Sequence, residues 1–341
     1  MEKVAFELSS HLSRLTDVKL VKWGGSNKWL PIVLPYLLFK SMWALTTSDI
    51  KVIYLQDGLL APLGVILKVF GKPVLVTVHG RDIAYENRLY QFLIPGSMKR
   101  LNRVTCVSSA IRDACLTKGV SADKAVVILN GISDEYYMNG DKPEARKKLE
   151  EILGKELGDR KILLSVGRFV EKKGIHWFVE NVMPELANTG CAYVIAGDGV
   201  LASLIKKRIE ENNLENSVFL AGWAEKGLLR ILYNAADMFI MPNVPVNGDM
   251  EGFGLVALET ASCGLPVVAS DLEGIKDAIQ DGKNGFLLEP GNARIFTDKI
   301  KELLENDELR QSFGAQARAF TMENFGWERM TEKYLGEFEK I

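Results

Sequence analysis

Residues 251–259, Glu-Gly-Phe-Gly-Leu-Val-Ala-Leu-Glu, contribute most to the fold assignment of this chain. Two carboxylates enclose two glycines, and the following residues predict a short helix from Leu255 and then a buried strand at Pro266–Ala269. Gly252 and Gly254 allow the backbone to come close to a ligand. A helix that begins near Leu255 would direct free N–H groups and its positive end at an anion such as phosphate. The spacing alone fits equally well an ordinary solvated glutamate pair beside a packing loop.

A second glycine-bounded loop carries two cations. Residues 161–166, Lys-Ile-Leu-Leu-Ser-Val, predict a buried strand, and Gly-Arg-Phe-Val-Glu-Lys-Lys-Gly follows at 167–174. Arg168 offers a planar fork of donors and Lys173 a compact charge, so the pair suits a diphosphate and could neutralise a leaving group. Taken alone, such a pair is more often surface charge. Together with the glutamate loop, it favours a phosphate site.

Five motifs in this order resemble the retaining glycosyltransferases of family 4, including the phosphatidylinositol mannosyltransferase-like enzymes. They are Thr77-Val78-His79-Gly80, Asn130-Gly131-Ile132, Gly167-Arg168 with Lys173-Gly174, the Glu-x7-Glu segment 251–259, and Asn284-Gly285-Phe286-Leu287. The resemblance covers nearly the whole chain. It implies the α/β GT-B fold, in which two Rossmann-like, doubly wound domains face a cleft. The C-terminal domain of that fold binds most of the nucleotide-sugar donor, and the N-terminal domain binds most of the acceptor.

The length of 341 residues and the alternation of strands with helices agree with two parallel-sheet domains. We expect an N-terminal acceptor-side domain over 1–145, a C-terminal nucleotide-sugar-binding domain over 146–325, and a helix over 326–341 that crosses back. Strands are predicted at Val18–Lys22, Val52–Leu55, Val74–Val78, Arg103–Val107, Ala125–Ile128, Ile162–Val166, Ala192–Ala196, Val218–Ala221, Met238–Met241, Pro266–Ala269 and Gly285–Leu288. Helices are predicted at Leu59–Phe70, Ser108–Lys118, Lys142–Leu157, Ile175–Leu186 and Leu201–Asn212.

The resemblance also assigns roles to individual residues. His79 ends an apolar strand, where open α/β sheets bind their ligands, and a histidine at this place in the family contacts the transferred sugar. A histidine satisfied by neighbouring backbone is the alternative. Asp82 either orients His79 or caps the following helix. The expected catalytic residues are His79, Arg168, Lys173 and Glu251. The expected donor-binding residues are Asn130, Gly167, Gly252, Phe253, Gly254, Leu255 and Glu259.

The reaction implied by the resemblance is retaining, front-face transfer of a hexose to a lipid or saccharide acceptor. The donor would be of the GDP-mannose or UDP-glucose type. Arg168 and Lys173 would stabilise the departing nucleoside diphosphate, whose phosphate oxygen takes the proton of the acceptor. Glu251 would bind sugar hydroxyls, and Glu259 would accept the two ribose hydroxyls. No cofactor and no metal ion is expected. A non-catalytic or truncated nucleotide-sugar-binding protein and a GT-B epimerase remain alternatives.

The start of the chain departs from the family pattern. Family members begin with a strand and a Gly-Gly loop, whereas Val4, Leu8, Leu12 and Leu15 predict a helix from the first residues. The absent strand would lie at the centre of a Rossmann sheet. We therefore expect either an incomplete gene product or compensation by repacking or by another subunit. Catalysis should be impaired if this is the whole polypeptide.

Composition narrows the range of partners. Forty-two basic and 44 acidic residues leave a net charge of −2. The chain therefore lacks the overall positive charge that is typical of nucleic-acid-binding proteins. Cysteines 106, 115, 191 and 263 lack Cys-x-x-Cys spacing, which predicts reduced thiols and a cytoplasmic location. Gly197-Asp198-Gly199 lacks the third glycine and the later acidic residue of a dinucleotide fingerprint, which argues against a dehydrogenase. The expected partners are the nucleotide-sugar donor and a glycan or lipid-linked acceptor, and self-association stays open.

The stretch Trp29–Leu45 is strongly apolar. It contains Lys40 and two prolines and is too short to span a bilayer. One interpretation is a helix that is buried or covered by another subunit. The other is a lipid-facing acceptor surface, in peripheral contact with the inner face of a membrane.

Overall fold

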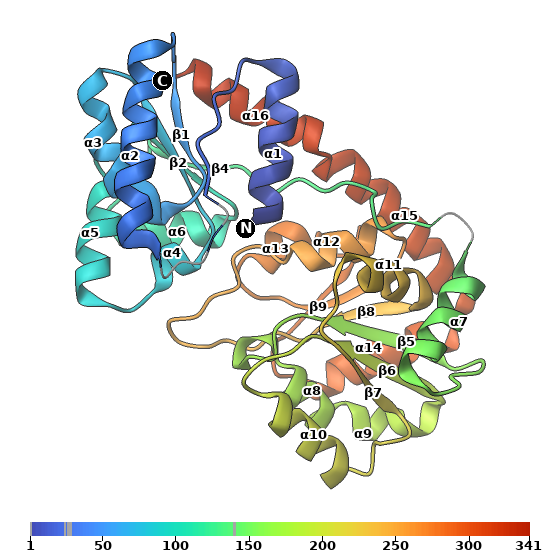
Figure 1. The fold of residues 1–341 in the computed structure, drawn as a ribbon. Coiled ribbons are helices and arrows are strands. Elements are labelled where there is room, and N and C mark those ends of the chain that lie inside the picture. Colours follow the sequence, from blue (N-terminus) through green and yellow to red (C-terminus); the bar gives the residue numbers. More distant parts are fainter. Residues whose placement is uncertain (1, 24, 26–28, 139–140) are drawn as a thin grey trace. The chain divides into compact units, whose positions relative to one another are not determined.

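The computed structural model describes residues 2–23, 25, 29–138 and 141–341, and the chain divides into two compact units (Figure 1). The first unit holds Met1–Gly131, Gly248–Phe253 and Trp327–Ile341, and the second holds Ile132–Asn247 and Gly254–Gly326. Residues 132–145 therefore join the second unit, ahead of the expected boundary after residue 145. They are held there because the Met138 amide donates to Asn234 and Lys142 pairs with Asp237.

The first unit is built on a four-stranded parallel sheet in the order β1-β2-β3-β4. The strands are β1 (Ile53–Leu55), β2 (Val74–Val78), β3 (Arg103–Cys106) and β4 (Ala125–Val127). The α-helices are α1 (Glu2–Leu15), α2 (Leu30–Thr47), α3 (Ala61–Leu67), α4 (Arg81–Ala84), α5 (Arg88–Met98), α6 (Ser109–Thr117) and α16 (Trp327–Glu339). Short 3₁₀ turns, η2 (Gly58–Leu60) and η3 (Lys68–Phe70), flank α3. In Figure 1, α2, α3 and α5 lie on one side of this sheet, and α1 and α16 lie on the other.

The strand expected at Val18–Lys22 does not form. These residues run as irregular chain, and Val18 and Leu20 are exposed. Val21 packs against the cluster of α2 and α3 side chains that includes Val33 and Leu63. A strand needs a neighbour to accept its backbone hydrogen bonds, and no described strand pairs with this segment.

The second unit has a six-stranded parallel sheet in the order β10-β9-β8-β5-β6-β7. Its strands are β5 (Lys161–Val166), β6 (Cys191–Ala196), β7 (Val218–Gly222), β8 (Met238–Met241), β9 (Val267–Ser270) and β10 (Phe286–Leu288). Its α-helices are α7 (Lys142–Leu153), α8 (Ile175–Asn181), α9 (Met183–Leu186), α10 (Ala202–Glu211), α11 (Lys226–Ala235), α12 (Leu255–Ser262), α13 (Ile275–Ala278), α14 (Ala293–Glu305) and α15 (Asp307–Phe325). Two 3₁₀ turns are η4 (Glu171–Lys173) and η5 (Ala187–Thr189).

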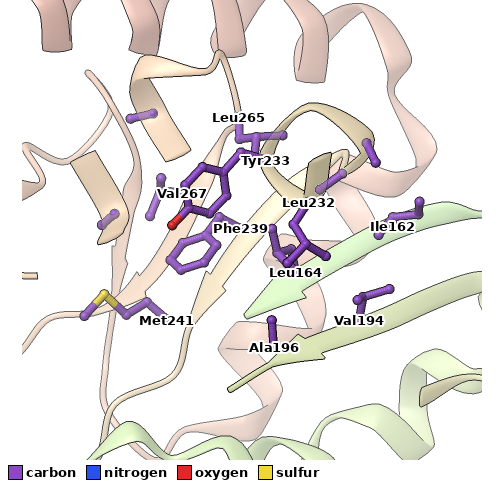
Figure 2. Close-up of a cluster of buried hydrophobic side chains, with 14 of the residues drawn as sticks. Ile162, Leu164, Val194, Ala196, Leu232, Tyr233, Phe239, Met241, Leu265 and Val267 are labelled. Atoms are coloured by element: carbon purple, nitrogen blue, oxygen red, sulfur yellow. The ribbon is translucent and has the colours of Figure 1, made fainter. Parts of the chain in front are cut away.

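Apolar residues on both faces of this sheet explain its stability as a layer between helices. Ile162 and Leu164 of β5 face one cluster with α7, α11, α12 and α15, and Leu163 faces another with α8, α10 and α14. Figure 2 shows the first cluster, where Tyr233 of α11 lies among Phe239 and other sheet side chains. Strands buried on both faces appear as continuous apolar runs, which is why the sequence predicts them within about two residues.

Two expected helices are broken where proline enters them. The segment expected as one helix over 175–186 forms α8 and α9, and Pro184 lies at the start of α9. Proline has no N–H for the bond that would continue α8. Leu59–Phe70 likewise divides into η2, α3 and η3, with proline in the first turn of α3. Within the described ranges, no helix combines the length and the hydropathy that a membrane span requires.

Candidate functional site

The strand order of the second unit reverses between β5 and β8. Strands β6 and β7 follow on one side of β5, and β8, β9 and β10 follow on the other. In open parallel sheets, ligands bind outside the carboxyl ends of the strands at such a switch point. The loop after β5 carries Arg168 and Lys173, and the chain after β8 leads to Gly254 and α12. The two predicted phosphate-binding elements of this unit therefore follow the two strands that meet at the switch point.

The loop over 167–174 is fixed by neighbouring loops on two sides. The Gly167 and Phe169 amides donate to the carbonyls of Ala196 and Asp198 at 3.0 and 2.8 Å. On the other side, the Val244 amide donates to the Lys172 carbonyl at 3.0 Å. Buried Phe169 anchors the loop, whereas the adjacent Arg168 is exposed. The guanidinium of Arg168 thus stands on a fixed backbone and is open to an anion.

Lys173 lies across the start of the same loop. A Cβ built on Gly167 would lie 3.6 Å from Cε of Lys173. The aliphatic part of the lysine therefore covers Gly167, and its ammonium group belongs to the same end of β5 as Arg168. The side chain of Lys173 thus lies against the residue that precedes Arg168.

Gly197 allows the Arg168 loop to pack closely on the chain after β6, a role that no motif in the sequence indicated. A Cβ at this position would lie 1.9 Å from the Gly167 carbonyl oxygen, and φ of Gly197 is +147°. No other residue fits such an approach without moving the loop. The Gly197-Asp198-Gly199 motif thus supports the Arg168 loop. Its signal in the sequence was a glycine pair after a strand, but only the fold shows what the pair contacts.

Helix α12 starts at Leu255, as the sequence predicts, and Gly254 precedes it in a left-handed conformation. Glu259 lies in the second turn and is only 5% exposed. Its Oε2 accepts a hydrogen bond of 2.9 Å from the Tyr233 hydroxyl. Burial, followed by the charge of Glu259, raises the pKa of Tyr233 well above its ordinary value, so the phenol remains a donor. Tyr233 is a positioning residue for Glu259 that no motif in the sequence indicated.

In the first unit, His79 follows β2 and is half-buried. Its Nε2 lies 3.0 Å from the Gln56 carbonyl oxygen. Since a carbonyl only accepts, Nε2 carries the proton in this contact. Nδ1 is then the ring nitrogen that remains for a substrate. The backbone contact expected as an alternative is present and sets the orientation of the ring.

Asp82 does not cap the following helix, but it holds the backbone of His79. It lies inside the first turn of α4, whose N-cap residue is Gly80, and no side-chain cap forms. Its carboxylate accepts from the His79 amide at 3.0 Å, the Gly80 amide at 2.7 Å and the Gly58 amide at 3.1 Å. Burial raises the pKa of Asp82, against the effect of these hydrogen bonds. Asp82 therefore fixes the backbone that carries His79 and does not touch the ring.

Residues 248–253 group with the first unit, and Gly252 packs there on the His79 backbone. A Cβ on Gly252 would lie 2.1 Å from the His79 carbonyl oxygen. Glu251 precedes this contact and is half-buried, and Phe253 follows it and is buried. The first unit thus brings His79 and the Glu251 segment together through a close backbone approach.

The two Asn-Gly motifs, at Asn130 and at Asn284, make contacts that hold the backbone. Asn130 is buried, and the neighbouring Gly131 packs on the Trp327 ring, 2.4 Å from the position of a Cβ. Asn284 is also buried. It donates to the Ala278 carbonyl at 3.0 Å and accepts from the Gln280 amide at 2.8 Å, which holds the turn before β10.

A pocket of about 470 Å³ opens at the opposite, amino-terminal ends of β5 and β8. Lys142, Arg146 and Asp237 line it. Lys142 and Arg146 both pair with Asp237, so their positive charge is balanced within the protein. This pocket contains none of the predicted site residues. Among the described residues, no three His, Cys, Asp or Glu side chains are grouped as metal ligands.

Comparison with known proteins gives two family matches. The family described as Glycosyl transferases group 1 matches residues 146–320, and the one described as Glycosyltransferase Family 4 matches residues 2–136. An uncharacterised glycosyltransferase of Methanocaldococcus jannaschii is 28% identical over 271 residues, which are 79% of this chain and 69% of that protein.

Solved structures show the same fold. A glycosyltransferase from Rickettsia africae superimposes with a TM-score of 0.80 at 19% identity, over 99% of this chain and 94% of that one. HepE of Anabaena in complex with UDP gives a TM-score of 0.76 at 21% identity, over 90% and 82% of the two chains. The fold is of the GT-B class, with two Rossmann-like units, each built on a parallel sheet.

Proposed function

This chain belongs to the Glycosyl transferases group 1 family and is a glycosyltransferase, and we propose that it moves a hexose from a nucleotide-diphosphate sugar to a glycan or lipid-linked acceptor. One observation carries the proposal. The loop with Arg168 and Lys173 and the chain leading to α12 both follow the strands at the switch point of the second sheet. The HepE structures in complex with UDP and with UDP-glucose support a donor of this class.

The second unit would hold the diphosphate and the ribose. Arg168 and Lys173 neutralise charge that grows on the diphosphate as the sugar bond breaks. Amides at the start of α12 bind a phosphate, because the first N–H groups of a helix have no partner within the helix. Glu259, oriented by Tyr233, accepts the ribose hydroxyls. Metal independence belongs to this proposal, since two side-chain cations supply the positive charge.

The first unit would act on the transferred sugar. Nδ1 of His79 and the carboxylate of Glu251 bind its hydroxyls, and the backbone contact at Gly252 keeps the two segments in register. Transfer proceeds with retention by front-face departure, and the leaving phosphate oxygen takes the proton of the acceptor. No side chain then needs to act as general base.

A panel of nucleoside diphosphates tests the donor part of this proposal. A ligand that binds only the folded protein raises Tm. We expect UDP or GDP to raise Tm and the matching nucleotide sugar to be hydrolysed slowly in the absence of an acceptor. A protein whose Tm responds to none of UDP, GDP and ADP would contradict the proposal. Conversion of the donor into its sugar epimer, detected by chromatography, would show that the activity is epimerisation and not transfer.

A further inference from the structure

The two units differ sharply in exposed apolar side chains. Of 21 large apolar side chains exposed in the described residues, 17 belong to the first unit. The other four, Ile152, Val200, Trp223 and Ile295, are scattered over the second unit. Single exposed apolar residues are ordinary on a soluble surface, but an accumulation on one side marks an interaction surface.

The accumulation is densest on α2. One side of this helix packs on α3 through Val33 and Leu37. The opposite side presents Trp29 at its start and then Ile32, Tyr36, Phe39 and Trp43, whose side chains are between 47% and 66% exposed. These residues recur every three or four positions and so share one face. A helix that is apolar on both sides has a partner on each of them.

The neighbouring helices extend this surface. Helix α3 packs against α2, and α5 packs against α3. All three lie on the same side of the first sheet in Figure 1. Ile66 and Val69 are exposed on α3 and η3, and Leu89 and Phe92 are exposed on α5. We call the exposed side chains of α2, α3, η3 and α5 the outer face.

The charges on these segments all have one sign. Residues 29–47, 58–72 and 88–100 contain six lysines and arginines and no aspartate or glutamate, although the whole chain has slightly more acidic than basic residues. Lys40 and Arg88 are exposed among the apolar residues. In the connecting segments, Asp49 pairs with Lys51 and Asp57 accepts from the Leu59 amide. Glu86, two residues before α5, is exposed and lies beside Gly248.

We propose that the outer face docks on an anionic lipid surface. Apolar and aromatic side chains with cations among them match the boundary between acyl chains and negative headgroups. The negatively charged inner leaflet of a membrane supplies such a surface on the cytoplasmic side. The protein would lie on this surface and not cross it, in agreement with the lack of a spanning helix among the described residues.

A second copy of the chain fits the outer face less well. A two-fold interface places the same patch on both partners. Two copies would then bring Lys40 and Arg88, the exposed cations of the outer face, against the same two cations with no carboxylate of these helices between them, and like charges in an interface are costly. The charge pattern therefore favours phospholipid over self-association. The proposal does not rest on the proposed function, because it concerns residues outside the candidate site.

Vesicle sedimentation with the full chain tests the proposal. We expect binding to vesicles of phosphatidylcholine mixed with phosphatidylglycerol, weaker binding at high salt, and little binding to phosphatidylcholine alone. Lys40→Glu with Arg88→Glu should weaken partitioning by at least about fivefold for each cation lost, since each contributes about 1 kcal/mol near such a surface. Phe39→Ser with Trp43→Ser should abolish detectable binding.

Matched variants in the second unit provide the controls. Trp223→Ser removes an exposed tryptophan, and Lys147→Glu with Lys206→Glu reverses two exposed lysines. Both should bind vesicles like the unaltered chain. Melting curves show that each variant is folded, and donor hydrolysis without vesicles should be unchanged in the Phe39 and Trp43 variant. Equal binding to neutral and anionic vesicles, binding to neither, or a dimer in sedimentation velocity that these two substitutions dissociate would overturn the proposal.

Discussion

The two units distribute their apolar residues in different ways. The second unit buries them in two layers around a six-stranded sheet and exposes few of them. The first unit has a four-stranded sheet and leaves the outer side of α2 uncovered. Under our two proposals, the second unit binds a polar ligand and the first docks on an anionic lipid surface.

Arg168→Ala should lower kcat by about 100- to 1,000-fold, because the charge that Arg168 offsets is larger in the transition state than in the bound donor. The affinity for the nucleoside diphosphate should change much less. Arg294→Ala is the matched control, since Arg294 is an exposed arginine on α14 of the same unit. Equal losses of kcat in both variants, or a loss confined to KM, would remove the leaving-group role.

Gly197→Ala should reduce kcat/KM by up to about 100-fold, because a displacement of the Arg168 loop by about 1 Å is enough for such a loss. Gly190→Ala is the control, since φ of Gly190 is also positive, at +72°, but open space surrounds its missing Cβ. Both variants should lose stability, and only Gly197→Ala should lose activity beyond that. Matching activities in the two variants would show that Gly197 does not support the loop.

Tyr233→Phe should raise the donor KM about tenfold with little change in kcat, because a hydrogen bond to a charged group contributes about 1.5–3 kcal/mol. Tyr193→Phe is the control. It removes a buried hydroxyl on β6 that donates to Ser165 on β5 at 2.6 Å. A drop in kcat for Tyr233→Phe at constant KM would contradict the role of Glu259 at the ribose.

His176→Gln should change only the acid side of the stability curve. Burial lowers the pKa of His176 in the folded chain, so protonation favours the unfolded chain. Stability is then lost as the pH falls from the ordinary histidine value, about 6.5, through the lowered folded-state pKa. As the pH falls from 7.5 to 5.5, the unaltered chain should lose stability that the variant keeps. The Tm of the variant minus that of the unaltered chain should therefore increase, by less than about 2 °C. A constant difference over this range would show that His176 does not titrate with unfolding.

Much of the second unit could be predicted from the sequence because local patterns determine it. Ile162–Val166 and Ala192–Ala196 are apolar runs that only a buried parallel strand explains, and both form strands. The start of α12 at Leu255 follows from the glycines before it. The family and the fold class likewise followed from short motifs in a fixed order.

The remaining features depend on contacts between distant residues. Val18–Lys22 has the composition of a strand, but pairing decides whether a strand forms, and pairing is not local. The Tyr233–Glu259 bond and the contact of Gly197 with Gly167 join segments that no spacing rule connects. Asp82 was expected either to orient His79 or to cap the following helix. Its real partners are three amides that only the fold brings within reach.

Hydrogen exchange with and without the nucleoside diphosphate that raises Tm most is the direct test of where the donor binds. We expect new protection at 167–174 and at 254–259, the two segments that follow β5 and β8. Residues 142–161, beside the pocket at the opposite ends of these strands, should be unchanged. Protection confined to that pocket, with none at 167–174, would contradict binding of the donor at the carboxyl ends of β5 and β8.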